Sequence, residues 1–242
     1  MTREIAVATI TPSGNRTVEK VTQSLCQALP GVVPLFSRIP VHGRTSPVAS
    51  PDGPYHWPSM ESAAELLSHA APAALCWNGS KGGDYGFDID ETLCRRLRDL
   101  TGLPTVTAAL SVLELLGRFG ATRIAVVTPY TAGVHARAVA GFRSKGFDVV
   151  GEAHADVDDN LAYGAIAPDA IADLARRALE GGGVQAVVFF CTNFHGAPAV
   201  PGLEAETGIP MIDSTAAGAW GLLRAAGVDT TPLARFGRIF SL

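Results

Sequence analysis

IAVAT, residues 5–9, returns almost unchanged as IAVVT, residues 124–128, and this repeat decides the fold. A second pair lies at nearly the same offset, because AALCWN, residues 73–78, returns as VVFFCTN, residues 187–193. Self-similarity that keeps its spacing over half of a chain indicates a duplicated structural unit. The sequence therefore predicts two similar lobes.

Apolar runs rich in β-branched residues alternate with longer segments of helical period, which is the pattern of parallel strands joined by crossover helices. We expect strands at residues 5–10, 32–39, 73–78, 104–107, 124–130, 148–153, 186–192 and 209–212. The clearest helices are expected from about Asp88, from about Pro168, and after an N-cap at Asp213. The predicted fold class is α/β, with two pseudo-symmetric Rossmann-like lobes, each a mostly parallel sheet flanked by helices.

The last helix is expected to cross back to the first lobe. We therefore assign residues 1–110 plus 214–242 to the first lobe and residues 111–213 to the second. Open parallel sheets bind ligands at the carboxyl ends of their strands, so two facing lobes place the active site in the cleft between them. Residues 41–58, rich in Gly, Pro and Ser, are expected to form a lid.

Composition and charge exclude several classes of protein. The chain has 242 residues and a net charge of −4 without a basic block, which argues against nucleic acid as a partner. The N-terminal MTREIAVATI lacks the apolar region of a signal peptide, and no apolar run approaches the roughly 20 residues that cross a bilayer. The cysteines form no CxxC pair and the histidines no metal-binding spacing. We expect a reduced, cytoplasmic protein that binds neither a membrane nor a metal.

Polar groups gather where the predicted strands end. The candidates are Asn15 after the first strand, Asn78, Gly79 and Ser80 at the end of the third, Tyr130 at the end of the fifth, and Cys191, Thr192 and Asn193 at the end of the seventh. Hydroxyl, amide and thiol groups with few carboxylates form a lining that suits an anion. The thiol of Cys191 is then a candidate acid/base or nucleophile, and the alternative is a small buried core residue.

Five segments, in this order, resemble the aspartate/glutamate racemase superfamily. They are TPSGNRTVE, SRIP, WNGSKGGDYGFDIDETLC, VVTPYT and CTNF, and within the superfamily they are most similar to the branch of maleate cis–trans isomerases and arylmalonate decarboxylases. The resemblance spans nearly the whole chain. It implies two pseudo-symmetric α/β lobes and chemistry, without a cofactor, at a carbon next to a carboxylate.

The resemblance also implies roles for single residues. Cys191 matches the catalytic cysteine of the second lobe, and the groups expected to bind carboxylate oxygens are Asn15, Ser80, Tyr130, Thr192 and Asn193. The first-lobe position has two alignments. Alignment on the strand places Cys76 there as a second catalytic residue, and the internal repeat favours it. Alignment on the glycine and hydroxyl places Gly79 there, with Asn78 and Ser80 beside it, and strand alternation favours this choice. We prefer Gly79, which leaves Cys191 alone.

The leading functional hypothesis is a cofactor-independent isomerase of the maleate cis–trans type, acting on a small mono- or dicarboxylate. One alternative is an arylmalonate-type decarboxylase that uses Cys191 alone as a proton donor. Another is an amino-acid or hydantoin-type racemase, which requires Cys76 and Cys191 to pair. A hypothesis from a different class is a non-catalytic carboxylate-binding protein. We also expect that the chain can form a homo-oligomer.

Overall fold

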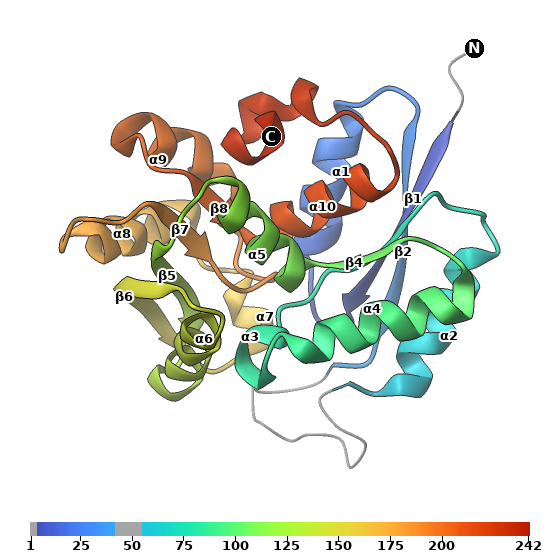
Figure 1. The fold of residues 1–242 in the computed structure, drawn as a ribbon, viewed down its shortest axis with the longest axis horizontal. Coiled ribbons are helices and arrows are strands. Elements are labelled where there is room, and N and C mark those ends of the chain that lie inside the picture. The colour runs from blue at the N-terminus through green and yellow to red at the C-terminus, as the bar shows by residue number, and fades with distance from the viewer. Residues whose placement is uncertain (1–3, 42–54) are drawn as a thin grey trace.

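The computed structural model describes residues 4–41 and 55–242, and its two parallel sheets have the same strand order (Figure 1). The first sheet has the order β2-β1-β3-β4 and the second the order β6-β5-β7-β8. The strands are β1 (Ile5–Pro12), β2 (Val32–Ile39), β3 (Leu75–Trp77), β4 (Thr105–Thr107), β5 (Arg123–Tyr130), β6 (Asp148–Val157), β7 (Ala186–Phe189) and β8 (Met211–Asp213). The prediction of two similar α/β lobes is therefore confirmed.

Helices flank both sheets. The first half of the chain forms α1 (Thr17–Gln27), α2 (Trp57–Ser68), α3 (Gly82–Tyr85), α4 (Asp88–Thr101) and α5 (Ala108–Arg118). The second half forms α6 (Ala132–Ser144), α7 (Asn160–Tyr163), α8 (Pro168–Leu179), α9 (Val200–Thr207) and α10 (Ser214–Ala225). Three short 3-10 helices, Ala197–Ala199, Thr231–Phe236 and Arg238–Ser241, accompany them. The three helices that the sequence marks most clearly, α4, α8 and α10, begin where predicted.

Helix α10 returns the chain to the first lobe. It is buried along nearly its whole length and packs against α1, α5, β3 and β4 (Figure 1). Its Trp220 belongs to a core cluster that also holds Val7 of β1 and Ile124 of β5, so one apolar core reaches into both lobes. This packing supports our proposed division into residues 1–110 plus 214–242 and residues 111–213.

The ends of β6 and β7 differ most from the prediction. β6 continues to Val157 because β5 pairs with it through two register shifts, which bring Tyr130 opposite Val157. β7 stops at Phe189, so Cys191 lies two residues beyond the strand. The last backbone bond along this edge runs from the Phe190 amide to the Val127 carbonyl, 2.9 Å, after which the chain turns. The cysteine therefore belongs to the turn and not to the ladder.

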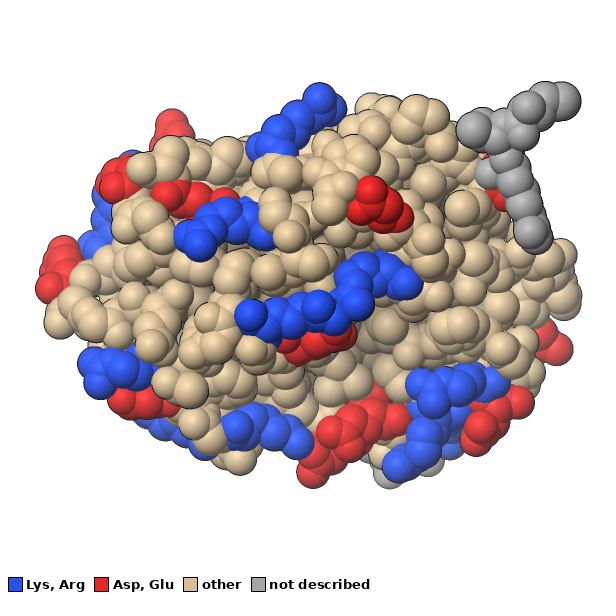
Figure 2. Space-filling model, turned by 45° about the horizontal axis from the view of Figure 1, so that its top comes forward, with Lys and Arg blue, Asp and Glu red and all other residues tan. Residues whose placement is uncertain are grey.

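The expectations for a lid, a membrane span and a metal site can be compared with the described residues. Most of the expected lid lies outside the described residues, since they omit 42–54. Among the described residues, no helix has the length and apolar character that a membrane span requires, and no three His, Cys, Asp or Glu side chains are grouped so that they could hold a metal ion. On the face drawn in Figure 2, basic and acidic side chains are interspersed over a mostly uncharged surface.

Candidate active site

The ends of β3, β5 and β7 bring three functional side chains together. Ser80, three residues after β3, has its Oγ 3.3 Å from the hydroxyl of Tyr130 at the end of β5. The Tyr130 hydroxyl is also hydrogen-bonded to the thiol of Cys191, which follows β7. Ser80 belongs to the first lobe and the other two to the second, so the group spans the two lobes as predicted.

Cys191 is almost completely buried, with 4% of its surface exposed. Its backbone amide donates to Ser214 Oγ at 3.2 Å, and the amides of Asn193 and Phe194 point at its sulfur. Burial raises the pKa of the thiol to about 11, although hydrogen bonds from Tyr130 and these two amides lower it. Since burial disfavours the charged form more than the donors favour it, the resting thiol is protonated at neutral pH.

Asn15 connects the first lobe to the residue after the cysteine. Its Nδ2 donates to Thr192 Oγ1 at 3.2 Å, and its Oδ1 accepts from the amides of Thr17 and Val18 at 2.9 and 3.0 Å. The asparagine thereby caps the start of α1, where amides have no helical partner. A side-chain amide has two N–H groups, so one N–H of Asn15 is left for a ligand.

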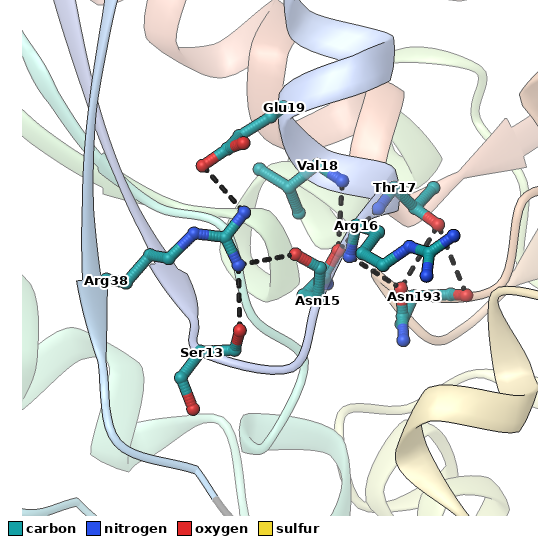
Figure 3. Close-up of polar contacts among 8 residues, drawn as sticks. All are labelled: Ser13, Asn15, Arg16, Thr17, Val18, Glu19, Arg38 and Asn193. Carbon is teal, nitrogen blue, oxygen red and sulfur yellow. Dashed lines mark hydrogen bonds and ion pairs between the residues drawn. The ribbon is translucent and has the colours of Figure 1, made fainter.

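Asn193 joins the lobes through its own side chain (Figure 3). Its Oδ1 accepts from the Arg16 amide at 3.2 Å and from Thr17 Oγ1 at 3.1 Å. Its Nδ2 donates to the Asn160 carbonyl at 2.5 Å. Most of the hydrogen-bonding capacity of this side chain is used by the protein. We therefore infer that the Asn193 side chain connects the two lobes and that its backbone amide interacts with Cys191.

Cys76 lies apart from this group. It sits in β3 with its Sγ 3.5 Å from the Gly218 carbonyl of α10, inside the core cluster that contains Trp220. Burial raises its pKa well above the usual range of a thiol. Because neighbouring strand residues point to opposite faces, Trp77 faces the other core, where it meets Tyr55 edge-on at 5.9 Å. The structure thus places the Cys76 thiol in the core, which disfavours the racemase alternative, since that alternative requires Cys76 and Cys191 to pair.

Asn78 and Gly79 complete the end of β3. Asn78 Nδ2 donates to the Thr215 carbonyl at 3.1 Å, which directs the side chain toward the start of α10. A Cβ built on Gly79 would lie 2.3 Å from Cζ2 of Trp77, so the indole leaves no room for a side chain at residue 79. Gly79, and not a thiol, thus precedes Ser80 at the cleft.

The expectation that site residues lie at strand ends missed residues at the start of α10 that hydrogen-bond to the backbone of Cys191 and Thr192. Thr215 Oγ1 donates to the Thr192 carbonyl at 2.9 Å, and Ser214 Oγ receives the Cys191 amide. Asp213 accepts from the Ala216 amide at 2.9 Å, and burial raises the pKa of its carboxyl to about 7. The sequence marked Asp213 only as a helix cap. The contacts of Ser214 and Thr215 could not be predicted from local sequence, because Cys191 and Thr192 lie 23 residues earlier in the chain.

The model of one protein family, arylmalonate decarboxylase, matches residues 59–240. The chain belongs to the arylmalonate decarboxylase family. An arylmalonate decarboxylase of Bordetella bronchiseptica is 27% identical over 184 residues, which cover 75% of this chain and 77% of that protein. A maleate isomerase of Pseudomonas putida is 26% identical over 242 residues, 95% of this chain and 94% of that protein. A crystal structure of a Pseudomonas putida maleate isomerase with maleate has a TM-score of 0.88 and 24% identity, and the match covers 99% of this chain and 98% of that one.

Membership of the arylmalonate decarboxylase family confirms the resemblance that the five segments indicated. Both kinds of enzyme named in that branch, an arylmalonate decarboxylase and a maleate isomerase, are similar to this chain. The roles of single residues are not decided by these similarities. They remain predictions that depend on the geometry of the cleft.

Proposed function

We propose that this member of the arylmalonate decarboxylase family is a cofactor-independent enzyme that acts on a small carboxylate through Cys191. One observation carries the proposal: the Cys191 thiol is next to uncharged donors, namely the Tyr130 hydroxyl, which also contacts Ser80, and the amides of Asn193 and Phe194. Donors fixed in a buried site stabilise charge that develops in a transition state. The charge here is that of an enediolate, a carbanion shared with a carboxylate.

The first candidate reaction is cis–trans isomerisation of the maleate type. The Cys191 thiolate adds to one alkene carbon, and the π electrons move through the neighbouring carbon onto its carboxylate. The new single bond rotates, the double bond forms again, and the thiolate leaves, so no atom is gained or lost. The maleate isomerase that is similar over 95% of the chain supports this reaction. Because the raised pKa keeps the Cys191 thiol protonated at neutral pH, the thiol must first lose its proton to solvent, which returns a proton to the thiolate after it leaves.

The second candidate is decarboxylation of a substituted malonate, which two observations favour. Gly79, which we prefer at the first-lobe position, carries no thiol, and Cys191 is protonated at neutral pH. The bond between the α-carbon and one carboxylate breaks, and that carboxylate leaves as carbon dioxide. The electron pair of the broken bond is shared with the other carboxylate, which forms an enediolate. The Cys191 S–H then gives its proton to carbon, and solvent returns a proton to sulfur. Racemisation needs a base on each face of the carbon, and Cys76 lies in the core.

Proton NMR in D₂O distinguishes these reactions. Maleate and a prochiral α-aryl-α-methylmalonate are incubated separately with wild type, with Cys191→Ala and with Cys76→Ala. Fumarate formed from maleate establishes isomerisation, and loss of carbon dioxide with deuterium at the α-carbon establishes decarboxylation. We expect activity to vanish in Cys191→Ala and to survive in Cys76→Ala.

Other outcomes revise the proposal. Loss of activity in a folded Cys76→Ala variant would restore the two-cysteine mechanism. If wild type converts neither compound yet calorimetry shows that it binds one of them, the proposed chemistry is wrong for these substrates and the non-catalytic carboxylate-binding protein is favoured. We further propose a cytoplasmic location, which the free thiols of all four cysteines support, and a homo-oligomeric state remains a prediction.

A further inference from the structure

We propose that Arg38 is a positioning residue that holds the turn after β1 so that Asn15 reaches Thr192 beside Cys191. The inference rests on the proposed function, because it assigns a role in catalysis to a residue outside the cleft group. Arg38 lies near the end of β2, paired in register with Thr11 of β1. That pairing places its side chain next to the turn that follows β1.

One guanidinium makes three contacts with this turn and the helix after it (Figure 3). Nη1 donates to the carbonyls of Ser13 and Asn15 at 2.8 and 2.9 Å. Nη2 pairs with Glu19 of α1 at 2.8 Å. The planar fork of an arginine fixes several acceptors in one orientation, which the single ammonium of a lysine does not reproduce. Arg38 thus sets the position of the Asn15 backbone.

The Asn15 side chain connects the turn after β1 to the residue that follows Cys191. Its Oδ1 holds the first amides of α1, and its Nδ2 reaches Thr192 in the other lobe. Arg38 therefore acts through Asn15, two hydrogen bonds away from Thr192. Both N–H groups of Nη1 donate to carbonyls and Nη2 pairs with Glu19, so these contacts direct the guanidinium at the turn and α1.

The ion pair with Glu19 is not the part that matters. The side chains of Arg38 and Glu19 are 38% and 29% exposed, and exposed pairs contribute little to stability. Glu19→Gln removes this pair and leaves both carbonyl bonds, which makes it the matched control. Arg38→Gln removes both carbonyl bonds, whereas Arg38→Lys keeps the charge and can restore one of them.

The first test needs no substrate. Amide hydrogen exchange at Thr17 and Val18 reports how firmly Asn15 caps α1. We expect Arg38→Gln to speed this exchange about tenfold, Arg38→Lys to have a smaller effect, and Glu19→Gln to leave it near wild type, because a tenfold change corresponds to about 1.4 kcal/mol, the size of about one net hydrogen bond. Unchanged exchange in folded Arg38→Gln overturns the proposal whether or not the enzyme's substrate is known.

The second test uses whichever compound the wild type converts. We expect Arg38→Gln to lower kcat about tenfold with a smaller change in KM, and Arg38→Lys to recover part of kcat. In an Asn15→Ala background, Arg38→Gln should have no further effect, since the two residues act in series. Additive losses in that cycle would contradict an action through Asn15. Absence of any turnover by wild type would contradict the proposed function and leave the exchange result to decide on Arg38.

Discussion

At the scale of single residues, the chemistry depends on the state of one thiol. Burial raises the Cys191 pKa to about 11, and the reactive form of a cysteine is the thiolate. We therefore expect its alkylation by iodoacetamide to accelerate about tenfold for each pH unit between 7 and 10. Peptide mass spectrometry separates Cys191 from the other three cysteines. A rate that levels off below pH 9 would show that the cleft lowers the pKa further than the structure indicates.

Tyr130 is the second residue on which the site depends. Its hydroxyl lies between Ser80 Oγ and the Cys191 thiol, so Tyr130→Phe removes the donor to the thiol and the hydrogen-bond partner of Ser80. We expect kcat to fall on the order of 10²-fold without loss of folding, because one fixed donor to an oxyanion contributes that much. Tyr85→Phe, on α3, is the matched control. An unchanged kcat in Tyr130→Phe would remove this tyrosine from the site.

At the scale of elements, the turn after β3 keeps a side chain out of the first-lobe position. A Cβ on Gly79 meets the Trp77 indole, whereas a Cβ on Gly117 of α5 meets nothing within 4 Å. We expect Gly79→Ala to destabilise the fold by about 1–3 kcal/mol through overpacking. Gly117→Ala should stabilise it by about 0.5–1 kcal/mol, since alanine favours a helix. Denaturant unfolding of both variants measures the difference, and equal effects would mean that Trp77 moves aside freely.

The same scale shows what the sequence predicts and what it does not. Short apolar runs located all eight described strands, and the expectation that ligands bind at strand ends placed Ser80, Tyr130 and Cys191 in one group. It did not separate Cys76 from Gly79, because that choice depends on which core Trp77 enters. Nor did it give the role of the Asn193 side chain. Its partner Arg16 is 177 residues away in the sequence, and the same separation lies between Asn15 and Thr192. Local sequence patterns do not predict which residues of the two lobes contact each other.

At the scale of the whole molecule, the lobes are held together on two sides of the cleft. On one side are the bonds of Asn15 and Asn193. On the other, α3 packs on α6, with an ion pair between Asp84 and Arg137. The glycines of this joint allow close approach, since a Cβ on Gly141 would lie 2.2 Å from the Gly83 carbonyl. Contacts on both sides favour a cleft of fixed width, in which donors need little reorganisation during reaction.

Asp90 and Asp213 are the two most deeply buried carboxyl groups among the described residues, and their burial makes the stability of the whole molecule depend on pH. Burial raises the pKa of Asp90 in the first lobe and of Asp213 at the end of β8 to about 7. Tyr55 donates its hydroxyl to Asp90 Oδ2 at 3.3 Å. In the unfolded chain an aspartate titrates near 4, so the folded state retains these protons over a range in which the unfolded state has lost them.

Stability from both groups is therefore complete below about pH 4 and is lost as the pH rises through about 7. We expect Asp90→Asn, which preserves shape and cannot ionise, to reduce the fall in the free energy of unfolding between pH 4.5 and 7.5. Asp99→Asn, on the exposed face of the same helix, should leave the fall as in wild type. Urea unfolding at both pH values gives the two slopes. If Asp90→Asn had the wild-type slope, Asp90 would be ionised in the folded protein at pH 4.5, and its burial would have to be offset by a donor that the structure does not show.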